Sequence, residues 1–197
     1  MDFAQVLRRR RMVRAFQDRE VDPAALERVL DAARRAPSAG FSQGVDLLVL
    51  TGRAATGRYW DLALPGAEAR GAFRWAGLLR APALVVPLVS SGAYHARYAE
   101  ADKAGRARGP EEWSVPFWWV DGGMAVMLAL LAAVDQGLGA AFFTLERAEA
   151  VLPAFGVPAD RAALGTIAVG HPAPCAPGRS STRPRRPLEE VVHRGAW

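Results

Sequence analysis

Cysteine, lysine and histidine are scarce in this chain of 197 residues. It has one cysteine, Cys175, one lysine, Lys103, and three histidines, at positions 95, 171 and 193. One cysteine excludes an internal disulfide, and the three histidines do not have the spacing of a zinc site. We therefore expect a reducing, cytoplasmic location and no bound metal.

Long apolar runs are also missing. The longest, from Gly122 to Val134, is shorter than the roughly 20 residues that span a bilayer and is bounded by Asp121 and Asp135. No apolar segment follows the N-terminal arginines, as a secretory signal would require. The sequence predicts a protein without a membrane partner, and its length fits a single domain over residues 1–197.

The common catalytic motifs are absent as well. There is no Walker A sequence, no nucleophile elbow, and no arrangement that favours a Ser-His-acid hydrolase. Gly137 and Gly139 resemble part of a dinucleotide fingerprint, but the third glycine is missing and the pair closes a helix instead of opening one. We interpret Gly137 as a helix C-cap.

What the chain does have is positive charge at both ends. Without ten terminal arginines and the two tail glutamates, Glu189 and Glu190, 15 basic and 18 acidic residues remain. Because guanidinium groups bind phosphate bidentately, two such clusters can converge on one phosphate-bearing cofactor. The alternatives are solvated surface arginines or a nucleic-acid or anion-binding module, although few aromatic side chains accompany these charges. The ten are Arg8, Arg9, Arg10, Arg11, Arg14, Arg179, Arg183, Arg185, Arg186 and Arg194.

Hydrophobic periodicity predicts an α+β fold, because helical and strand patterns alternate irregularly. Helices are expected from Phe3 into the arginines, over Asp22 to Arg35 with Asp22 as N-cap, over Tyr59 to Leu79, and over Trp118 to Gln136, which is apolar nearly all round and should be the central core helix. Strands are expected over Val45 to Leu50, Ala83 to Val89, Ala140 to Leu145 and Leu164 to Gly170, with a last short strand at Leu188, Val191 and Val192. The polar stretch from Gly92 to Pro116 is interpreted as a mobile cover over a site.

Four segments in a fixed order carry a family resemblance. Arg10 to Phe16 closes the first expected helix, Ala36 to Gln43 ends the second, Gly137 to Gly139 precedes a strand, and Arg183 to Glu190 opens the tail. Together they resemble the FMN-dependent nitroreductase family over nearly the whole chain. The resemblance implies a three-layer α/β/α fold with a mixed, mostly antiparallel central sheet, in a homodimer with exchanged C-terminal tails.

The resemblance also implies where FMN binds. Arg10 and Arg14 would meet the phosphate and ribityl oxygens, joined by two arginines of the tail, and Arg11 and Met12 would also lie at the cofactor. The second segment would approach the flavin from the other subunit, and backbone groups after the third would contact the flavin ring, with the Thr144 amide near N5. The remaining residues implied are Arg183, Arg185, Pro37, Ser38, Ala39, Phe41, Gln43, Thr144 and Leu145.

Two positions depart from the family pattern. Met12 stands where the family usually has serine, which removes a hydroxyl donor to the cofactor. Phe41 stands where asparagine is usual, so an apolar ring replaces a polar contact beside the flavin. Two interpretations of Phe41 stay open: it lines the substrate pocket, or it packs at the dimer interface.

The implied activity is an NADH- or NADPH-dependent oxidoreductase in which the flavin takes a hydride at N5 and an electron-poor acceptor, such as a nitroaromatic or a quinone, receives the electrons. The alternative is a specialised chemistry on the same cofactor: dehalogenation, dehydrogenation of a peptide ring, or flavin breakdown. No acid or base side chain is required, so the sequence names no catalytic residue.

Overall fold

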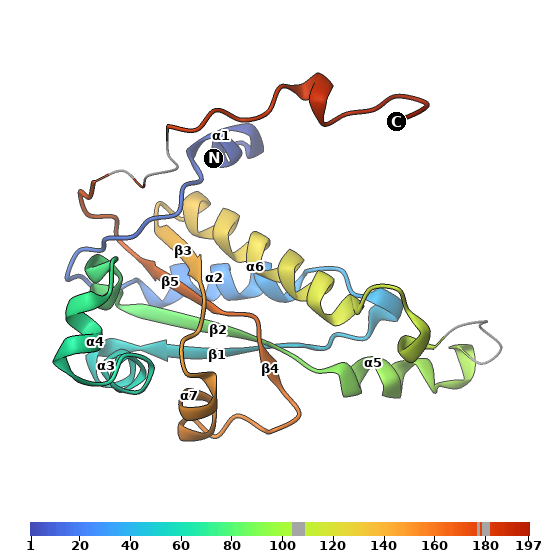
Figure 1. The fold of residues 1–197 in the computed structure, drawn as a ribbon, viewed down its shortest axis with the longest axis horizontal. Coiled ribbons are helices and arrows are strands. Elements are labelled where there is room, and N and C mark those ends of the chain that lie inside the picture. Colours follow the sequence, from blue (N-terminus) through green and yellow to red (C-terminus); the bar gives the residue numbers. More distant parts are fainter. Residues whose placement is uncertain (104–108, 177, 179–181) are drawn as a thin grey trace.

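A five-stranded sheet lies between two layers of helices in the computed structural model, which describes residues 1–103, 109–176, 178 and 182–197 (Figure 1). Each described strand pair is antiparallel, and an isolated parallel bridge between Met12 and Ala140 makes the sheet mixed. The predicted three-layer α+β fold is confirmed. The strand order is β1 (Val45–Thr51), β2 (Ala83–Val89), β5 (Thr166–Gly170) and β3 (Gly139–Phe143), with β4 (Ala162–Ala163) beside β2.

Two hydrophobic cores form because side chains alternate across the sheet. On one face, Leu84, Val86 and Leu88 of β2 pack with residues of α3 (Gly52–Ala63) and α7 (Ala148–Ala154). On the other face, Ala83 and Val85 pack with α2 (Pro23–Arg34) and α6 (Phe117–Asp135). All seven residues of β2 are buried. The continuous apolar run predicted for this strand therefore corresponds to a strand covered on both faces.

The helix boundary signals act as predicted at α2 and α6. The Asp22 side chain accepts hydrogen bonds from the amides of Ala24 and Ala25, and Pro23 is the first helical residue. Gly137 has a φ of +71° directly after α6, as expected of a C-cap glycine. At the N-terminus, α1 (Phe3–Arg9) is capped by Asp2.

The single helix predicted over Tyr59 to Leu79 is wrong. Instead α3 starts earlier and ends at Ala63, and it is followed by α4 (Gly66–Ala72) and the 3-10 helix η2 (Ala76–Arg80). Pro65 lies between α3 and α4, and Gly66 has a φ of +79°. A proline without an amide donor, followed by a left-handed residue, ends the helical hydrogen-bond ladder.

The predicted last strand is also wrong. Leu188–Glu190 forms a 3-10 turn, η5, and every residue from 182 to 197 is exposed. A strand requires a neighbour to accept its backbone hydrogen bonds, and among the described residues the exposed tail has none.

The expectation that α6 is the central core helix holds for one of its faces only. One face, including Ala125, Ala129 and Ala133, is buried in the core, whereas Trp119 and Met127 are 42 % and 46 % exposed. Within the described residues, α6 alone is long and apolar enough to cross a membrane by length and composition. Its packing against the sheet accounts for that composition on one face only.

The stretch expected to be a mobile cover is partly helical where the structure describes it. It forms α5 (Ser91–Tyr98) and the 3-10 helices η3 (Ala101–Lys103) and η4 (Pro110–Glu112), and residues 104–108 lie outside the described residues. The Trp113 ring packs edge-on against Tyr98, with a centroid distance of 4.9 Å, and against Phe117 at 5.1 Å. The described parts of this stretch are therefore packed at the N-terminal end of α6.

Candidate functional site

The N-terminal arginines are held along the outer edge of β3. After α1 the chain is extended, and the Val13 amide donates to the Ala140 carbonyl at 2.9 Å, while the Gln17 amide donates to the His171 carbonyl at 2.9 Å. A Cβ atom on Gly139 would lie 2.8 Å from Val13 Cγ2, so glycine is needed for this close approach. The segment that bears Arg10 and Arg14 is thus fixed to the sheet.

Arg14 shares an aromatic platform with an arginine that the sequence motifs do not include. The Cζ atoms of Arg14 and Arg74 each lie 4.6 Å from the centroid of the Trp75 ring. Such cation–π contacts orient a guanidinium while leaving its N–H donors available. Gly77 permits the contact, because a Cβ atom there would lie 2.6 Å from the Arg14 carbonyl oxygen.

These arginines form a local excess of positive charge. Among the described residues, no ion pair joins Arg10, Arg11, Arg14 or Arg74 to a carboxylate. The linker to the tail passes nearby: a Cβ atom on Gly178 would lie 3.5 Å from Arg14 Nη1. A doubly charged anion such as a phosphate monoester therefore has the donors it prefers at this edge.

A cavity of about 180 Å³ lies beside the Trp75 ring, on which Arg14 and Arg74 stack. Its walls are mainly aromatic, and the rings of Trp60 and Phe143 stack at 5.7 Å between centroids with an interplanar angle of 9°. Trp75 belongs both to the platform and to this wall. A ligand with a planar apolar ring and a phosphate would therefore find both environments side by side. The lining residues are Tyr59, Trp60, Ala63, Leu64, Phe73, Trp75, Leu78, Phe143, Thr144 and Glu146.

Thr144 and Leu145 directly follow β3. Thr144 is exposed and lines the cavity, whereas the side chain of Leu145 is buried in the core. Met12 packs its half-buried side chain against both cores. At Leu145 and Met12, only backbone groups are therefore offered to a ligand.

A second hollow, of about 560 Å³, is larger but contains none of the predicted site residues. Asp18 and Arg53 form an ion pair in its wall, and Glu20 faces it beside Arg19 and Arg80. Because its charges are mixed and none of the predicted site residues lines it, we place the candidate site at the smaller aromatic cavity. Elsewhere in the described chain, no group of three or more His, Cys, Asp or Glu side chains is arranged to hold a metal ion.

The second predicted segment, residues 37–43, forms a tight turn around η1 (Ala39–Phe41). The Gln43 amide donates to Ser38 Oγ at 3.0 Å, and the Ala39 amide donates to Asp121 Oδ2 at 2.9 Å. Asp121 is 3 % exposed and also accepts a hydrogen bond from the Tyr94 hydroxyl at 2.6 Å. Burial, reinforced by the hydrogen bond to Asp121, raises the pKa of Tyr94, so its hydroxyl stays a donor at neutral pH.

The turn does not meet the arginines within one chain. Asp121, which anchors the turn, and Asp135, at the end of α6 near β3, are 14 residues apart on one helix, or about 21 Å at 1.5 Å per residue. Pro37, Phe41 and Gln43 are exposed at the far end of that helix from Val13 and Ala140.

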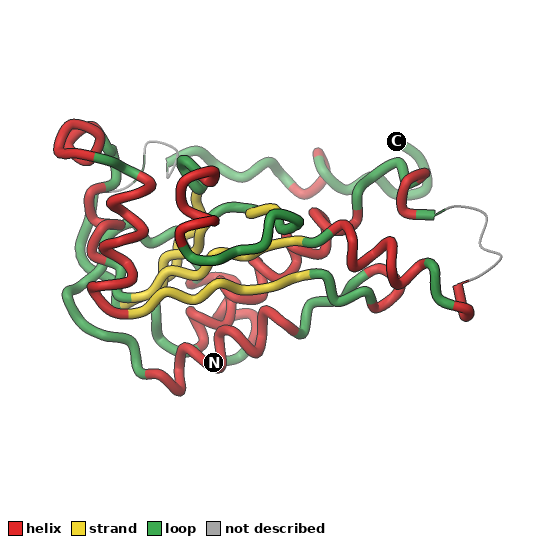
Figure 2. The backbone as a smooth tube through the Cα atoms, turned by 90° about the horizontal axis from the view of Figure 1, so that it is seen from below, coloured by secondary structure: helices red, strands yellow, loops and turns green. Residues whose placement is uncertain are grey.

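The tail arginines also lie apart from the N-terminal ones. The tail and α1 overlap in Figure 1 but separate in the perpendicular view of Figure 2. Arg183 and Arg185 are exposed. One chain therefore brings Arg14 and Thr144 together with Arg74 and Trp75, which the motifs missed, but not with the turn or the tail.

Known proteins resemble this chain in sequence and in fold. The chain matches the family model described as "Nitroreductase family" over residues 7–171. A curated relative from Methanothermobacter thermautotrophicus, provisionally named an NADH dehydrogenase/NAD(P)H nitroreductase, is 26 % identical over 178 residues, which cover 88 % of this chain and 78 % of the relative.

Solved structures share the fold. A nitroreductase family protein from Clostridium difficile 630 superposes with a TM-score of 0.73 and 20 % identity, covering 100 % of both chains. A provisionally named nitroreductase from Desulfovibrio desulfuricans, solved in complex with FMN, superposes with a TM-score of 0.71 and 23 % identity, covering 100 % of this chain and 98 % of the other.

Proposed function

This chain belongs to the nitroreductase family, and we propose that it is an FMN-dependent oxidoreductase that passes electrons from NADH or NADPH to an electron-poor acceptor such as a nitroaromatic or a quinone. The observation that carries the proposal is the shared position of Trp75, which supports two guanidinium groups without an ion pair among the described residues and lines the aromatic cavity beside Thr144. The relative named for NAD(P)H and the neighbour solved with FMN support the cofactor and the reductant.

The residues present fit FMN. The phosphate would bind to Arg10, Arg11 and Arg14, and Arg74 adds a further cation on the same platform. The ring would lie against apolar walls near Thr144, whose backbone amide is the proposed donor to the flavin. The missing hydroxyl at Met12 leaves the backbone and the neighbouring arginines to hold this part of the cofactor.

FMN supplies the redox chemistry when bound, because it accepts a hydride and passes electrons on. The protein needs only to bind, orient and shield. Trp60, Phe73 and Phe143 keep the cavity apolar, which strengthens the electrostatic interactions inside it. Glu146 is the only carboxylate in its lining, and we assign no proton transfer to it.

We also propose a homodimer in which each site is completed by the partner. The turn at residues 37–43 lies about 21 Å along α6 from the arginine edge, so a second copy must supply it. Exposed apolar side chains follow that path on α6, at Phe117, Trp119, Met124 and Met127. The exposed tail, with Leu188 at 67 % and Trp197 at 100 % exposure, is suited to pack on the partner and to carry Arg183 and Arg185 there.

An absorbance spectrum tests the proposal directly. We expect the purified protein to be yellow, or to become yellow on adding FMN, and to lose that colour when NADH or NADPH is added without oxygen. Reoxidation by menadione or nitrofurazone then tests the acceptor class. A protein that binds no added FMN would show that this chain has lost the family's cofactor.

A further inference from the structure

The turn at residues 38–43 holds an exposed aromatic ring in a strained backbone. Phe41 is 71 % exposed and has a φ of +58°. Gly40 and Gln43 also have positive φ angles, of +65° and +51°. Positive φ is uncommon for residues other than glycine and costs free energy, so surrounding contacts must hold it. Strain of this kind concentrates at functional sites, and contacts from other elements hold Phe41 in this conformation.

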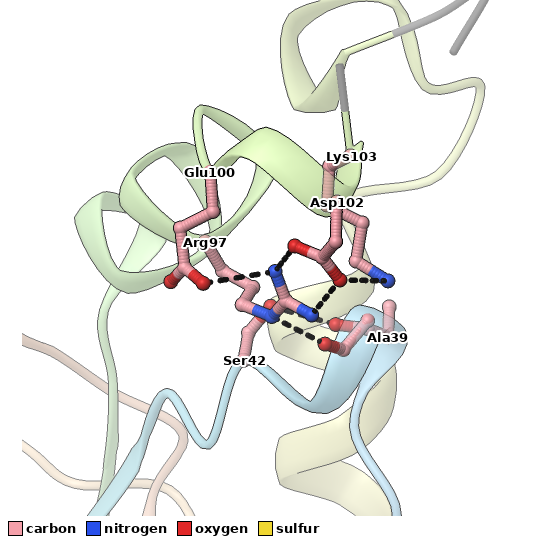
Figure 3. Close-up of polar contacts among 7 residues, drawn as sticks. Ala39, Ser42, Arg97, Glu100, Asp102 and Lys103 are labelled. Carbon is pink, nitrogen blue, oxygen red and sulfur yellow. Dashed lines mark hydrogen bonds and ion pairs between the residues drawn. The ribbon is translucent and has the colours of Figure 1, made fainter. Parts of the chain in front are cut away.

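Arg97 of α5 is the main contact to this turn from outside it. Its Nε donates to the Gly40 carbonyl at 2.9 Å, and the side chain is only 20 % exposed. Its other nitrogens donate to the two carboxylate oxygens of Asp102 at 2.6 and 2.7 Å, and Nη1 also donates to Glu100 at 3.1 Å. Figure 3 shows Arg97 between these carboxylates and the turn bearing Ala39 and Ser42.

Asp102 stays ionised at neutral pH, so its hydrogen bonds with Arg97 persist there. The hydrogen bond from Arg97 lowers the pKa of Asp102 to about 2, with smaller contributions from the charges of Arg97 and Lys103. Because Asp102 stays ionised, the guanidinium keeps a fixed orientation toward Gly40.

Two further contacts fix the rest of the turn. Asp121 accepts the Ala39 amide, and Ser42 Oγ donates to the Ala39 carbonyl at 2.6 Å. The Tyr98 ring packs directly against Gly40, since a Cβ atom on Gly40 would lie 2.7 Å from Tyr98 Cε2. The backbone is therefore held at several points, while the Phe41 ring itself projects outward.

We propose that Arg97 is a positioning residue that holds the Gly40 carbonyl so that the Phe41 ring forms an apolar wall of the acceptor pocket in the partner's site, and that this wall favours planar aromatic acceptors. The inference rests on the proposed function and dimer. A ring held outward before any ligand binds can stack on a planar acceptor without further loss of conformational freedom.

A double-mutant cycle tests whether Arg97 acts through Phe41. In FMN-loaded enzyme, Arg97→Ala and Phe41→Ala should each raise KM for menadione about 3- to 10-fold, the range of a lost aromatic contact, with kcat changed less. KM for ferricyanide, which has no ring to stack, should stay the same. The double variant should resemble Phe41→Ala alone, since contacts that act as a unit are not additive. Additive effects, or an unchanged KM for menadione in Arg97→Ala, would overturn the inference.

Arg161→Ala is the matched control. Arg161 is a similarly half-buried arginine that donates to Asp46 and Asp160, both at 2.6 Å, and it does not contact the turn. Its removal should leave both KM values unchanged. Arg97→Lys keeps one donor for Gly40 and should restore part of the lost affinity, whereas a purely charge-based role would give full restoration.

Amide hydrogen exchange provides a readout that does not need FMN. Exchange across residues 37–44 should accelerate in Arg97→Ala and in the milder Asp102→Asn, but not in Arg161→Ala. Unchanged exchange would overturn the positioning role. If the wild-type protein binds no FMN, the proposed function fails and the acceptor role of Phe41 fails with it. If Phe41→Ala weakens the dimer while KM is unchanged, Phe41 is an interface residue and only this inference is overturned.

Discussion

The guanidinium carbon of Arg14 lies 4.6 Å from the centre of the Trp75 ring. These residues are far apart in sequence, and Gly77 and the extended segment along β3 bring them together. The contact joins the positive edge of the sheet to the aromatic cavity.

Substitution of Arg14 should weaken FMN binding more than substitution of Arg74, the other arginine on the Trp75 ring. A charge-assisted hydrogen bond is worth about 1.5–3 kcal/mol, so Arg14→Ala should raise the Kd for FMN roughly 10- to 100-fold. Arg74→Ala, at an exposed position, should raise it less. Quenching of flavin fluorescence measures both.

Arg58→Ala is the control for that prediction. The Arg58 guanidinium also stacks over an aromatic ring, 5.1 Å from the centroid of Phe155, but it donates to the Ala154 carbonyl and does not line the cavity. It should leave the Kd for FMN unchanged. Equal losses for Arg58→Ala and Arg14→Ala would show that general charge, not the platform, governs binding.

A charge on the exposed face of α6 should break the proposed dimer. Met127 is 46 % exposed on that face, and burying an unpaired carboxylate in an apolar interface is unfavourable. Met127→Glu should weaken the dimer at least about 100-fold and reduce FMN binding as well. Sedimentation velocity measures the association, with Ala54→Glu on the exposed face of α3 as the control. A fully dimeric Met127→Glu would refute this interface.

Tyr59→Phe should destabilise the fold at neutral pH. The Tyr59 hydroxyl pairs with Thr166 Oγ1 at 2.7 Å, and both residues are fully buried. Leaving the threonine without its partner should lower the free energy of unfolding by about 1–2 kcal/mol in urea titrations.

The same variant should change the alkaline limit of stability. Burial raises the pKa of Tyr59 to about 12, against about 10 in an unfolded chain. The wild-type contribution is therefore complete below pH 10 and is lost as the pH rises toward 12, because the unfolded state releases the proton first. The stability gap between wild type and Tyr59→Phe should narrow over that range. A constant gap from pH 8 to pH 11.5 would contradict the assignment.

Two helical glycines should respond to alanine with opposite signs. At Gly57 in α3 a Cβ atom meets nothing within 4 Å, so Gly57→Ala should stabilise by about 0.5–1 kcal/mol. At Gly122 in α6 it would lie 2.9 Å from Val89 Cγ1 and 2.7 Å from Leu164 Cδ2. Overpacking costs about 1–3 kcal/mol, which outweighs the gain in helix propensity. Urea titrations of both variants check the contrast.

Local signals were sufficient for the elements whose ends are set by their own residues. Asp22 and Pro23 begin α2, Gly137 ends α6, and β2 was recognisable from its continuous apolar residues. The resemblance supplied the three-layer arrangement. Periodicity failed at Pro65, which separates α3 and its aromatic residues from Phe73 and Trp75, and in the tail, where the apolar pattern has no partner strand among the described residues.

The site was only partly predictable for a related reason. Arg14 and Thr144 follow from motif order, and the structure brings both to the Trp75 ring. Arg74 and Trp75 carry no motif, and their position depends on the close approach at Gly77, a tertiary contact. Arg97 was hidden in a polar stretch, because its role depends on a carbonyl 57 residues away in sequence.

The backbone bridge between Met12 and Ala140 has a consequence beyond ligand binding. β3 is the last strand on its side of the sheet, and this leading segment covers its otherwise unpaired groups. Truncation past Val13 would therefore have two effects. It would remove Arg10 and Arg11, which are proposed to bind the phosphate, and it would expose an edge strand to which other chains could add. Protection of the sheet edge and the proposed binding of FMN would then depend on the same few residues.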